Sequence, residues 1–140
     1  MTWFKEYTIE DLHAMANGTI LEVTGIEITA MGENTLSGKM PVDERTKQPA
    51  GILHGGASVV LAETLGSVAS YMLIDPEKYI AVGQSINANH IRPGISGYVY
   101  GKCEPVHLGS KSHVWNIEIV NEEQKLVCVS RLTMAIIEKK

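Results

Sequence analysis

Cysteine is scarce in this sequence: only Cys103 and Cys128 occur among its 140 residues, and they lie far apart with no paired spacing. Disulfide frameworks and cysteine-based zinc sites are built from closely spaced pairs, so the sequence predicts neither. We expect both thiols to be free and buried, as in proteins of a reducing compartment. The five histidines also lack metal-ligand spacing, and we interpret His13 and His113 as surface or structural residues.

An excess of positive charge is also lacking. The formal net charge at pH 7 is -4, which excludes an overall basic field for nucleic acid, and we expect no DNA-binding appendage. Residues 1–6 do not form the basic and apolar pattern of a secretory signal, so we expect a cytoplasmic protein. Any anion site must therefore come from a local cluster of positive groups.

No apolar run is free enough of polar residues to predict a membrane span. The longest, residues 57–74, contains Glu63, Thr64, Gly66 and three serines, which are costly in hydrocarbon. We interpret it as the buried helix of a soluble protein. The length of the chain and its 44% hydrophobic content are typical of one globular domain over residues 1–140, and no internal repeat or linker is visible.

Local signals predict the order helix, two strands, long helix, four strands. Thr8 can cap a first helix that ends at Gly18, and residues 19–42 are β-branched and partly alternating with a break at 31–34, which indicates two strands. Residues 43–51 are typical of a loop. The four later strands are expected at about residues 80–91, 98–107, 111–120 and 125–137. This order predicts an α+β domain whose largely antiparallel sheet wraps around one helix.

A glycine pair, Gly55 and Gly56, leads into the long helix. Glycines leave the backbone N–H groups uncovered at the positive end of the helix dipole, which suits the binding of an oxyanion. The simpler interpretation is that the pair only permits a tight turn and close packing. For the glycines taken alone, that structural interpretation is favoured.

Glu63 is the carboxylate of a helix that is apolar nearly all round, where a charge is seldom left without a partner or a task. Glu63, Ser67 and Ser70 recur at i, i+4 and i+7, which predicts one narrow polar stripe. Such a carboxylate is a candidate base or nucleophile. The alternative is a structural hydrogen bond to a neighbouring strand.

Gly55 and Glu63 are eight positions apart, roughly 12 Å along a helix at 1.5 Å per residue. One carbonyl group does not easily contact both from a single chain. If Gly55 binds the oxyanion and Glu63 attacks, the two should come from different subunits whose long helices run antiparallel about a two-fold axis. The spacing therefore favours an active site shared across a dimer interface.

Four segments carry a family resemblance: residues 41–49, 53–63, 87–90 and 130–133. Together they resemble the hotdog-fold thioesterases of the PaaI-like group, which include the bacterial 1,4-dihydroxy-2-naphthoyl-CoA hydrolases of menaquinone synthesis and the proofreading thioesterases of enterobactin synthesis. The resemblance covers nearly the whole chain. It implies an antiparallel sheet wrapped around a long central helix. It also implies hydrolysis of an aryl or related acyl-CoA, with 1,4-dihydroxy-2-naphthoyl-CoA as the leading candidate.

The resemblance also assigns roles to five residues. It implies that Glu63 is the nucleophile or general base, that the Gly55 amide polarises the thioester carbonyl, and that Gln48 and His54 complete the site. Ser67 then positions water or the carboxylate. Attack by the carboxylate would form a mixed anhydride, whereas deprotonation of water would give direct hydrolysis, and the sequence leaves both open. Neither route needs a metal or a cofactor.

By the same resemblance, the nucleotide end of coenzyme A contacts residues at strand ends and turns, where phosphate can be bound without burying a charge. The residues implied are Gly83, His90, Ile91, Arg92, Pro93, His107, Leu108, Gly109, Ser110, Lys111 and Ser112. The family also implies a homodimer in which two sheets meet edge to edge, and dimers that pair into a homotetramer.

Three other functions stay open. The first is the same chemistry on acyl groups tethered to a carrier protein, which hydrolysis rates on the two forms of one acyl group would distinguish. The second is a hotdog protein that binds acyl-CoA without turning it over, which the intact Glu63, Gln48, His54 and Gly55 argue against. The third, a hotdog dehydratase or hydratase, usually places its catalytic pair differently.

Overall fold

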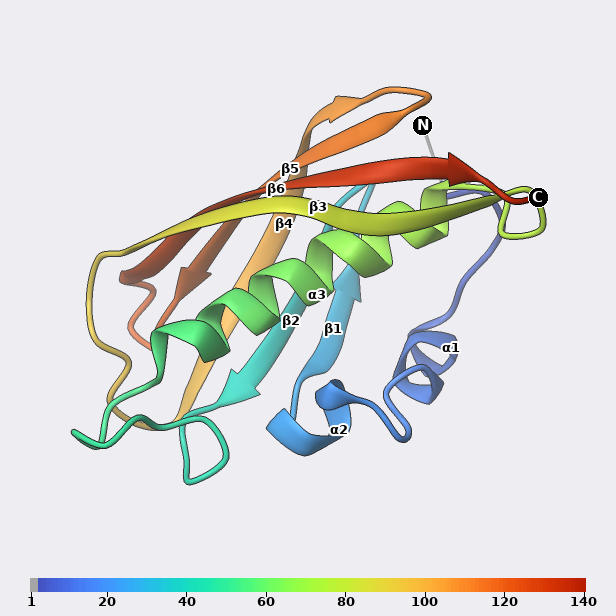
Figure 1. Ribbon diagram of the computed structural model, residues 1–140. Helices are drawn as coiled ribbons and strands as arrows, with labels where there is room; N and C mark the ends of the chain where they lie inside the picture. The colour runs from blue at the N-terminus through green and yellow to red at the C-terminus, as the bar shows by residue number, and fades with distance from the viewer. Residues whose placement is uncertain (1–2) are drawn as a thin grey trace.

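The computed structural model describes residues 3–140, and over that range it contains three helices and six strands (Figure 1). The strands form one antiparallel sheet in the order β1-β2-β4-β5-β6-β3. In chain order the elements are α1 Ile9–Ala14, α2 Ile20–Thr24, β1 Glu27–Met31, β2 Leu36–Pro41, α3 Gly55–Leu73, β3 Tyr79–His90, β4 Tyr98–Leu108, β5 Ser112–Val120 and β6 Leu126–Glu138. The predicted α+β hotdog fold is confirmed.

The long helix α3 lies across the sheet, which curves around it (Figure 1). Nine of its residues are buried. A Cβ atom at Gly66 would lie 3.3 Å from Trp115 Cδ1 and still closer to Leu132 Cδ2, so glycine lets the helix axis approach β5 and β6. Length and composition alone would allow α3 to cross a membrane, but its buried face packs on the sheet, as predicted for a core helix.

The first helix is shorter than the sequence indicates. Thr8 caps α1 as predicted, since its Oγ1 accepts from the Asp11 N–H at 3.1 Å while Asp11 Oδ2 accepts from the Thr8 N–H at 2.9 Å. However, α1 ends at Ala14 and does not reach Gly18.

The prediction of strand from residue 19 onward was wrong, because residues 20–24 form α2. Thr19 Oγ1 accepts from the Leu21 N–H at 3.2 Å, and Gly25 ends the helix with a positive φ of 77°. A capping threonine followed three residues later by Glu22 is a helix-start signal that outweighs the β-branched composition of this segment. The tight turn predicted near residues 31–34 does connect β1 to β2.

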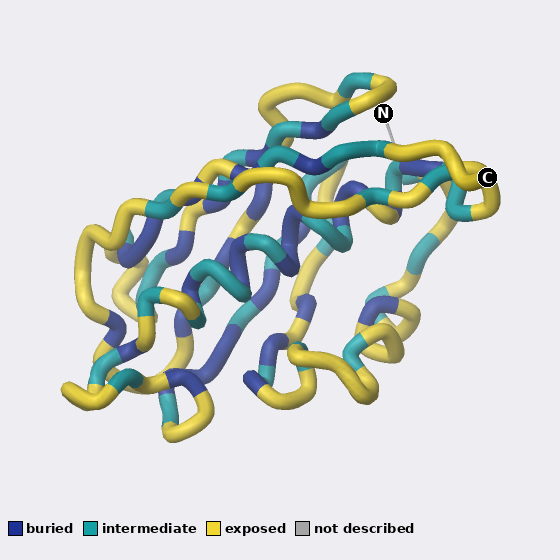
Figure 2. Tube along the Cα trace, viewed as in Figure 1, coloured by how far each residue is buried: buried dark blue, intermediate teal, exposed yellow. Residues whose placement is uncertain are grey.

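Among the strands of residues 3–140, the outermost strand β3 forms one edge of the sheet and pairs only with β6. None of its residues 79–90 is buried, and Figure 2 shows this strand as exposed or partly exposed along its length. Its unpaired N–H and C=O groups are therefore open to a further strand. Both cysteines are buried and free, as predicted.

Candidate active site

The N-terminus of α3 is shaped by His54, the residue that caps it. The Nδ1 atom of His54 accepts from the Gly56 N–H at 2.8 Å, so the neutral ring carries its proton on Nε2. The His54 carbonyl accepts from Ala57 and Ser58. The first-turn amide of Gly55 has no acceptor within the helix, and it meets none elsewhere in residues 3–140. This N–H is thus available at the positive end of the helix dipole.

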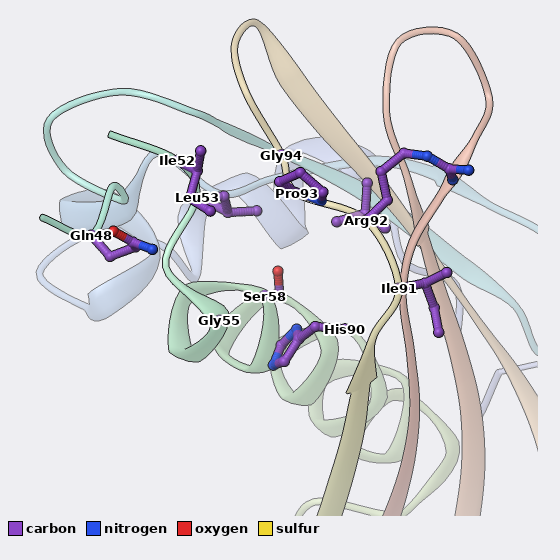
Figure 3. A pocket seen from close by; sticks show the side chains of 11 residues that line it. Gln48, Ile52, Leu53, Gly55, Ser58, His90, Ile91, Arg92, Pro93 and Gly94 are labelled. Carbon is purple, nitrogen blue, oxygen red and sulfur yellow. The ribbon is translucent and has the colours of Figure 1, made fainter. Parts of the chain in front are cut away.

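A cavity of about 410 Å³ opens beside this turn (Figure 3). One wall comes from the loop before α3 and the first turn of the helix, and the other comes from the end of β3 and the segment that follows. A Cβ atom at Gly55 would lie 2.8 Å from His90 Nε2, so glycine is needed for the imidazole to pack there. The lining residues are Gln48, Ile52, Leu53, Gly55, Ser58, His90, Ile91, Arg92, Pro93, Gly94 and Val127.

Six residues predicted from the sequence therefore meet in one place: Gln48, Gly55, His90, Ile91, Arg92 and Pro93. The Gln48 Oε1 atom accepts from the Ala50 N–H, which leaves its NH₂ group as the end available to a ligand. Ser58 was not among the predicted residues, yet its buried side chain also faces this cavity (Figure 3). The sequence did contain a signal for it, a serine one turn after the glycine pair at which the helix begins.

Arg92 supplies the positive charge of this region. Its Nη1 donates to the Leu126 carbonyl at 2.7 Å, and no carboxylate within residues 3–140 forms an ion pair with it. The guanidinium is exposed and donates to a neutral backbone acceptor, while Glu122 and Glu123 line a neighbouring cavity with Arg92. Such a group can bind a phosphate without the cost of breaking an existing ion pair.

Glu63 and Ser67 lie in a different cleft of about 310 Å³. Glu63 is half-buried, and its carboxylate has no hydrogen-bonding or ionic partner in the described part of the chain. Its Oε2 atom packs against Gly83, where an added Cβ would come closer than 3.0 Å. The structure thus places Gly83, which the resemblance assigned to substrate binding, directly beside the Glu63 carboxylate.

The polar stripe predicted along α3 is only partly correct, because Ser70 is fully buried. Its Oγ lies 2.8 Å from the Trp115 indole Nε1, which donates to it, and 2.8 Å from His113 Nδ1. The strands twist across the helix, so β5 covers α3 at this turn and leaves Ser67 and Glu63 uncovered about one and two turns earlier. Burial and the neighbouring His107 lower the pKa of His113, which is a structural core residue as expected.

The remaining predicted residues, on the β4–β5 hairpin, lie at the opposite end of α3. Leu108, Gly109 and Ser110 line a third cavity of about 470 Å³ near Asp75, while His107 and Lys111 are exposed. Ser112 accepts from the Gly109 N–H at 2.8 Å through its carbonyl and closes the hairpin. Within one chain, the structure does not bring this hairpin to Arg92 or to Gly55.

Comparison with known proteins shows the family of this chain. The model of the thioesterase superfamily matches residues 50–128, which include the glycine turn, Glu63 and β3. The chain belongs to the thioesterase superfamily. It is therefore an enzyme that hydrolyses thioesters, as the resemblance implied.

Individual members of the thioesterase superfamily match this chain along nearly its whole length. It is 51% identical over 137 residues to the 1,4-dihydroxy-2-naphthoyl-CoA hydrolase of Escherichia coli, covering 98% of this chain and 100% of that protein. It is 47% identical over 136 residues to the proofreading thioesterase EntH of Cronobacter turicensis, covering 97% and 98%. The crystal structure of a mutant thioesterase from Pseudomonas aeruginosa superposes with a TM-score of 0.97 at 43% identity, covering 99% and 100%.

Proposed function

We propose that this thioesterase hydrolyses acyl-CoA at two active sites shared between the subunits of a homodimer, with Glu63 as the attacking carboxylate. The leading candidate substrate is 1,4-dihydroxy-2-naphthoyl-CoA, because the Escherichia coli relative that hydrolyses it is 51% identical over 98% of this chain. The products are the free acid and coenzyme A.

The observation that carries the proposal is the separation of Gly55 from Glu63. The two residues line different cavities of one chain, yet a thioester carbonyl must meet an oxyanion donor and the attacking group within about 3 Å of each. The reactive group of each half-site is available to a substrate, since the Gly55 N–H and the Glu63 carboxylate have no hydrogen-bonding or ionic partners in the described chain. A second subunit joins them if Glu63 faces the partner subunit's Gly55.

The contacts within one chain support the position of the two-fold axis. Gly55 packs against His90, and Glu63 packs against Gly83. An axis that brings Glu63 to the partner subunit's Gly55 consequently also brings Gly83 beside the partner subunit's His90. Both positions are on β3, the unpaired edge strand, and their midpoint falls between Ile86 and Asn87. Antiparallel pairing of the two β3 strands would satisfy their open N–H and C=O groups and make one continuous sheet.

The proposed chemistry follows from these positions. The Gly55 N–H donates to the thioester oxygen and stabilises the charge that develops there, by about 3 kcal/mol if it resembles measured oxyanion donors. Glu63 of the other subunit attacks the carbonyl carbon, and the C–S bond breaks to release the coenzyme A thiolate. Water then hydrolyses the mixed anhydride and restores the carboxylate. Alternatively, Glu63 takes a proton from water, which attacks the carbonyl directly, and Ser67 positions that water.

We assign the phosphates of coenzyme A first to Arg92, which lines the cavity beside Gly55 and forms no ion pair within residues 3–140. The hairpin residues 107–112 lie at the far end of α3 within one chain, so they would contact the same nucleotide only from another subunit. The partner in the dimer, or a subunit of a second dimer in a homotetramer, would provide that contact.

The test is a thiol-release assay with wild-type protein and Glu63→Gln. Aryl, short-chain and long-chain acyl-CoA substrates are compared, together with one acyl group presented on a carrier protein. The substitution keeps the shape of the side chain but removes its charge, so hydrolysis should fall by about 10²-fold or more. Circular dichroism and the Tm should be unchanged. Near-normal turnover by Glu63→Gln would contradict the assignment.

A further inference from the structure

The cleft that contains Glu63 is built by two helices, one of which was unexpected. Along α3 the lining residues recur every three or four positions, so they share one helical face. The opposite wall is α2, through Ile20 and Leu21. The full lining is Ile20, Leu21, Val60, Glu63, Thr64, Ser67 and Val68.

Although it is short, α2 is anchored at both ends. Glu22 Oε2 accepts from the Gly18 N–H at 2.9 Å, and Thr24 Oγ1 donates to the Ile20 carbonyl at 2.7 Å. The carbonyl of Leu21 accepts from the Ile26 N–H at 2.9 Å, and the Leu21 side chain packs on the core. These contacts fix the orientation of the helix, so Ile20 projects from a defined position.

Ile20 is a large apolar side chain that remains 53% exposed beside a carboxylate. The walls of its cleft are aliphatic apart from Glu63, Ser67 and the largely buried Thr64, and no cationic side chain from the described part of the chain lines it. The volume of about 310 Å³ lies at the lower end of the roughly 300–1,000 Å³ of small-molecule sites. This chemistry favours a compact, apolar acyl group and disfavours an anionic one.

We propose that α2 is the wall that selects the acyl group, with Ile20 as its specificity-determining residue. The inference rests on the proposed function, since the thioester carbonyl must sit at Glu63 for the rest of the acyl group to reach α2. A flat aromatic group can then pack one face against the branched Ile20 side chain. We expect a two-carbon acyl group to be too short to contact Ile20.

The experiment compares wild type, Ile20→Ala, Ile20→Trp and the control Val23→Trp on 2-naphthoyl-CoA and acetyl-CoA. Val23 is on the same helix and 66% exposed, but it does not line the cleft. We expect Ile20→Trp to lower kcat/KM for 2-naphthoyl-CoA about tenfold or more, as steric changes in an apolar pocket do, while acetyl-CoA hydrolysis stays within about twofold. Ile20→Ala should lower the ratio of kcat/KM for 2-naphthoyl-CoA to kcat/KM for acetyl-CoA. Val23→Trp should change kcat/KM for neither substrate.

A binding measurement separates this inference from the proposed function. In the Glu63→Gln background, which should turn over little substrate, Ile20→Trp should weaken binding of 2-naphthoyl-CoA about tenfold or more. Equal effects of Ile20→Trp on both substrates, no effect on either, or the same effect from Val23→Trp would overturn the role of Ile20. Absence of hydrolysis by wild type together with normal Ile20-dependent binding would instead overturn the proposed function and leave the acyl wall standing.

Discussion

The carboxylate of Glu63 packs directly on Gly83, at the point where β3 carries a bulge opposite β6. No side chain could occupy position 83 without moving this carboxylate, since a Cβ there would fall closer than 3.0 Å to Oε2. Strand β3 therefore blocks movement of the Glu63 carboxylate toward position 83. Its glycine has a steric role that does not require any contact with substrate.

Gly83→Ala should consequently reduce activity with little loss of stability. The atom that must move is the end of a flexible side chain, so the fold tolerates the methyl group while the carboxylate is displaced. Because a misplacement of about 1 Å can cost roughly 10²-fold in rate, we expect kcat to fall by about 10- to 100-fold. Steady-state kinetics and the Tm check this, with Ser85→Ala on the same strand as a control. A Gly83→Ala enzyme with full activity would show that Glu63 does not attack from this position.

Mixed dimers test whether the active site is shared. Glu63→Gln and Gln48→Ala alter residues in different cavities of one chain. Co-assembled, they should recover about a quarter of wild-type activity, because about half the dimers are mixed and each of these carries one intact site. The activity of each variant alone and of the co-purified mixture is measured at equal protein concentration. Activity no higher than the average of the two variants would place both residues in the same subunit's site.

Two serines of α3 should separate activity from stability. Ser70→Ala removes the partner of two buried groups, the Trp115 indole N–H and His113 Nδ1, and should cost about 2 kcal/mol or more of unfolding free energy. Ser67→Ala, in the open cleft, should leave stability unchanged and slow hydrolysis roughly tenfold if it positions water. Denaturant titration and thiol release are measured on both. The reverse pattern would reassign the two roles.

Burial of His113 predicts a pH dependence of stability. Its pKa in the folded protein lies below the ordinary value of 6.5, first because of desolvation and second because of His107. The unfolded state therefore binds more protons below about pH 6.5, so the folding free energy becomes less favourable as the pH falls through that range. Denaturant unfolding at several pH values should show that the free energy of unfolding decreases less with falling pH for His113→Gln than for wild type. Parallel curves would mean that another group controls this dependence.

Several features of this protein were determined by its sequence alone. The Thr8 capping box, the long apolar helix entered at Gly55, and the strands on either side of it depend on neighbours a few residues away, so local patterns predict them. Likewise, the eight positions between Gly55 and Glu63 follow from helical rise, and this spacing already indicated two separate half-sites. Nearby signals were also present for α2, in Thr19, Glu22 and Gly25, but the β-branched residues obscured them.

Only the tertiary structure decided what each polar residue of α3 faces. Ser67 and Ser70 look alike in the sequence, yet β5 covers one and leaves the other open, because the twist of the sheet determines which side of the helix is buried at each turn. The same holds for Gly83 beneath Glu63 and for Ile20 beside it, which are 20 and 43 positions away in the chain. Contacts over such separations depend on how the whole sheet packs around α3, and no local pattern of residues encodes them.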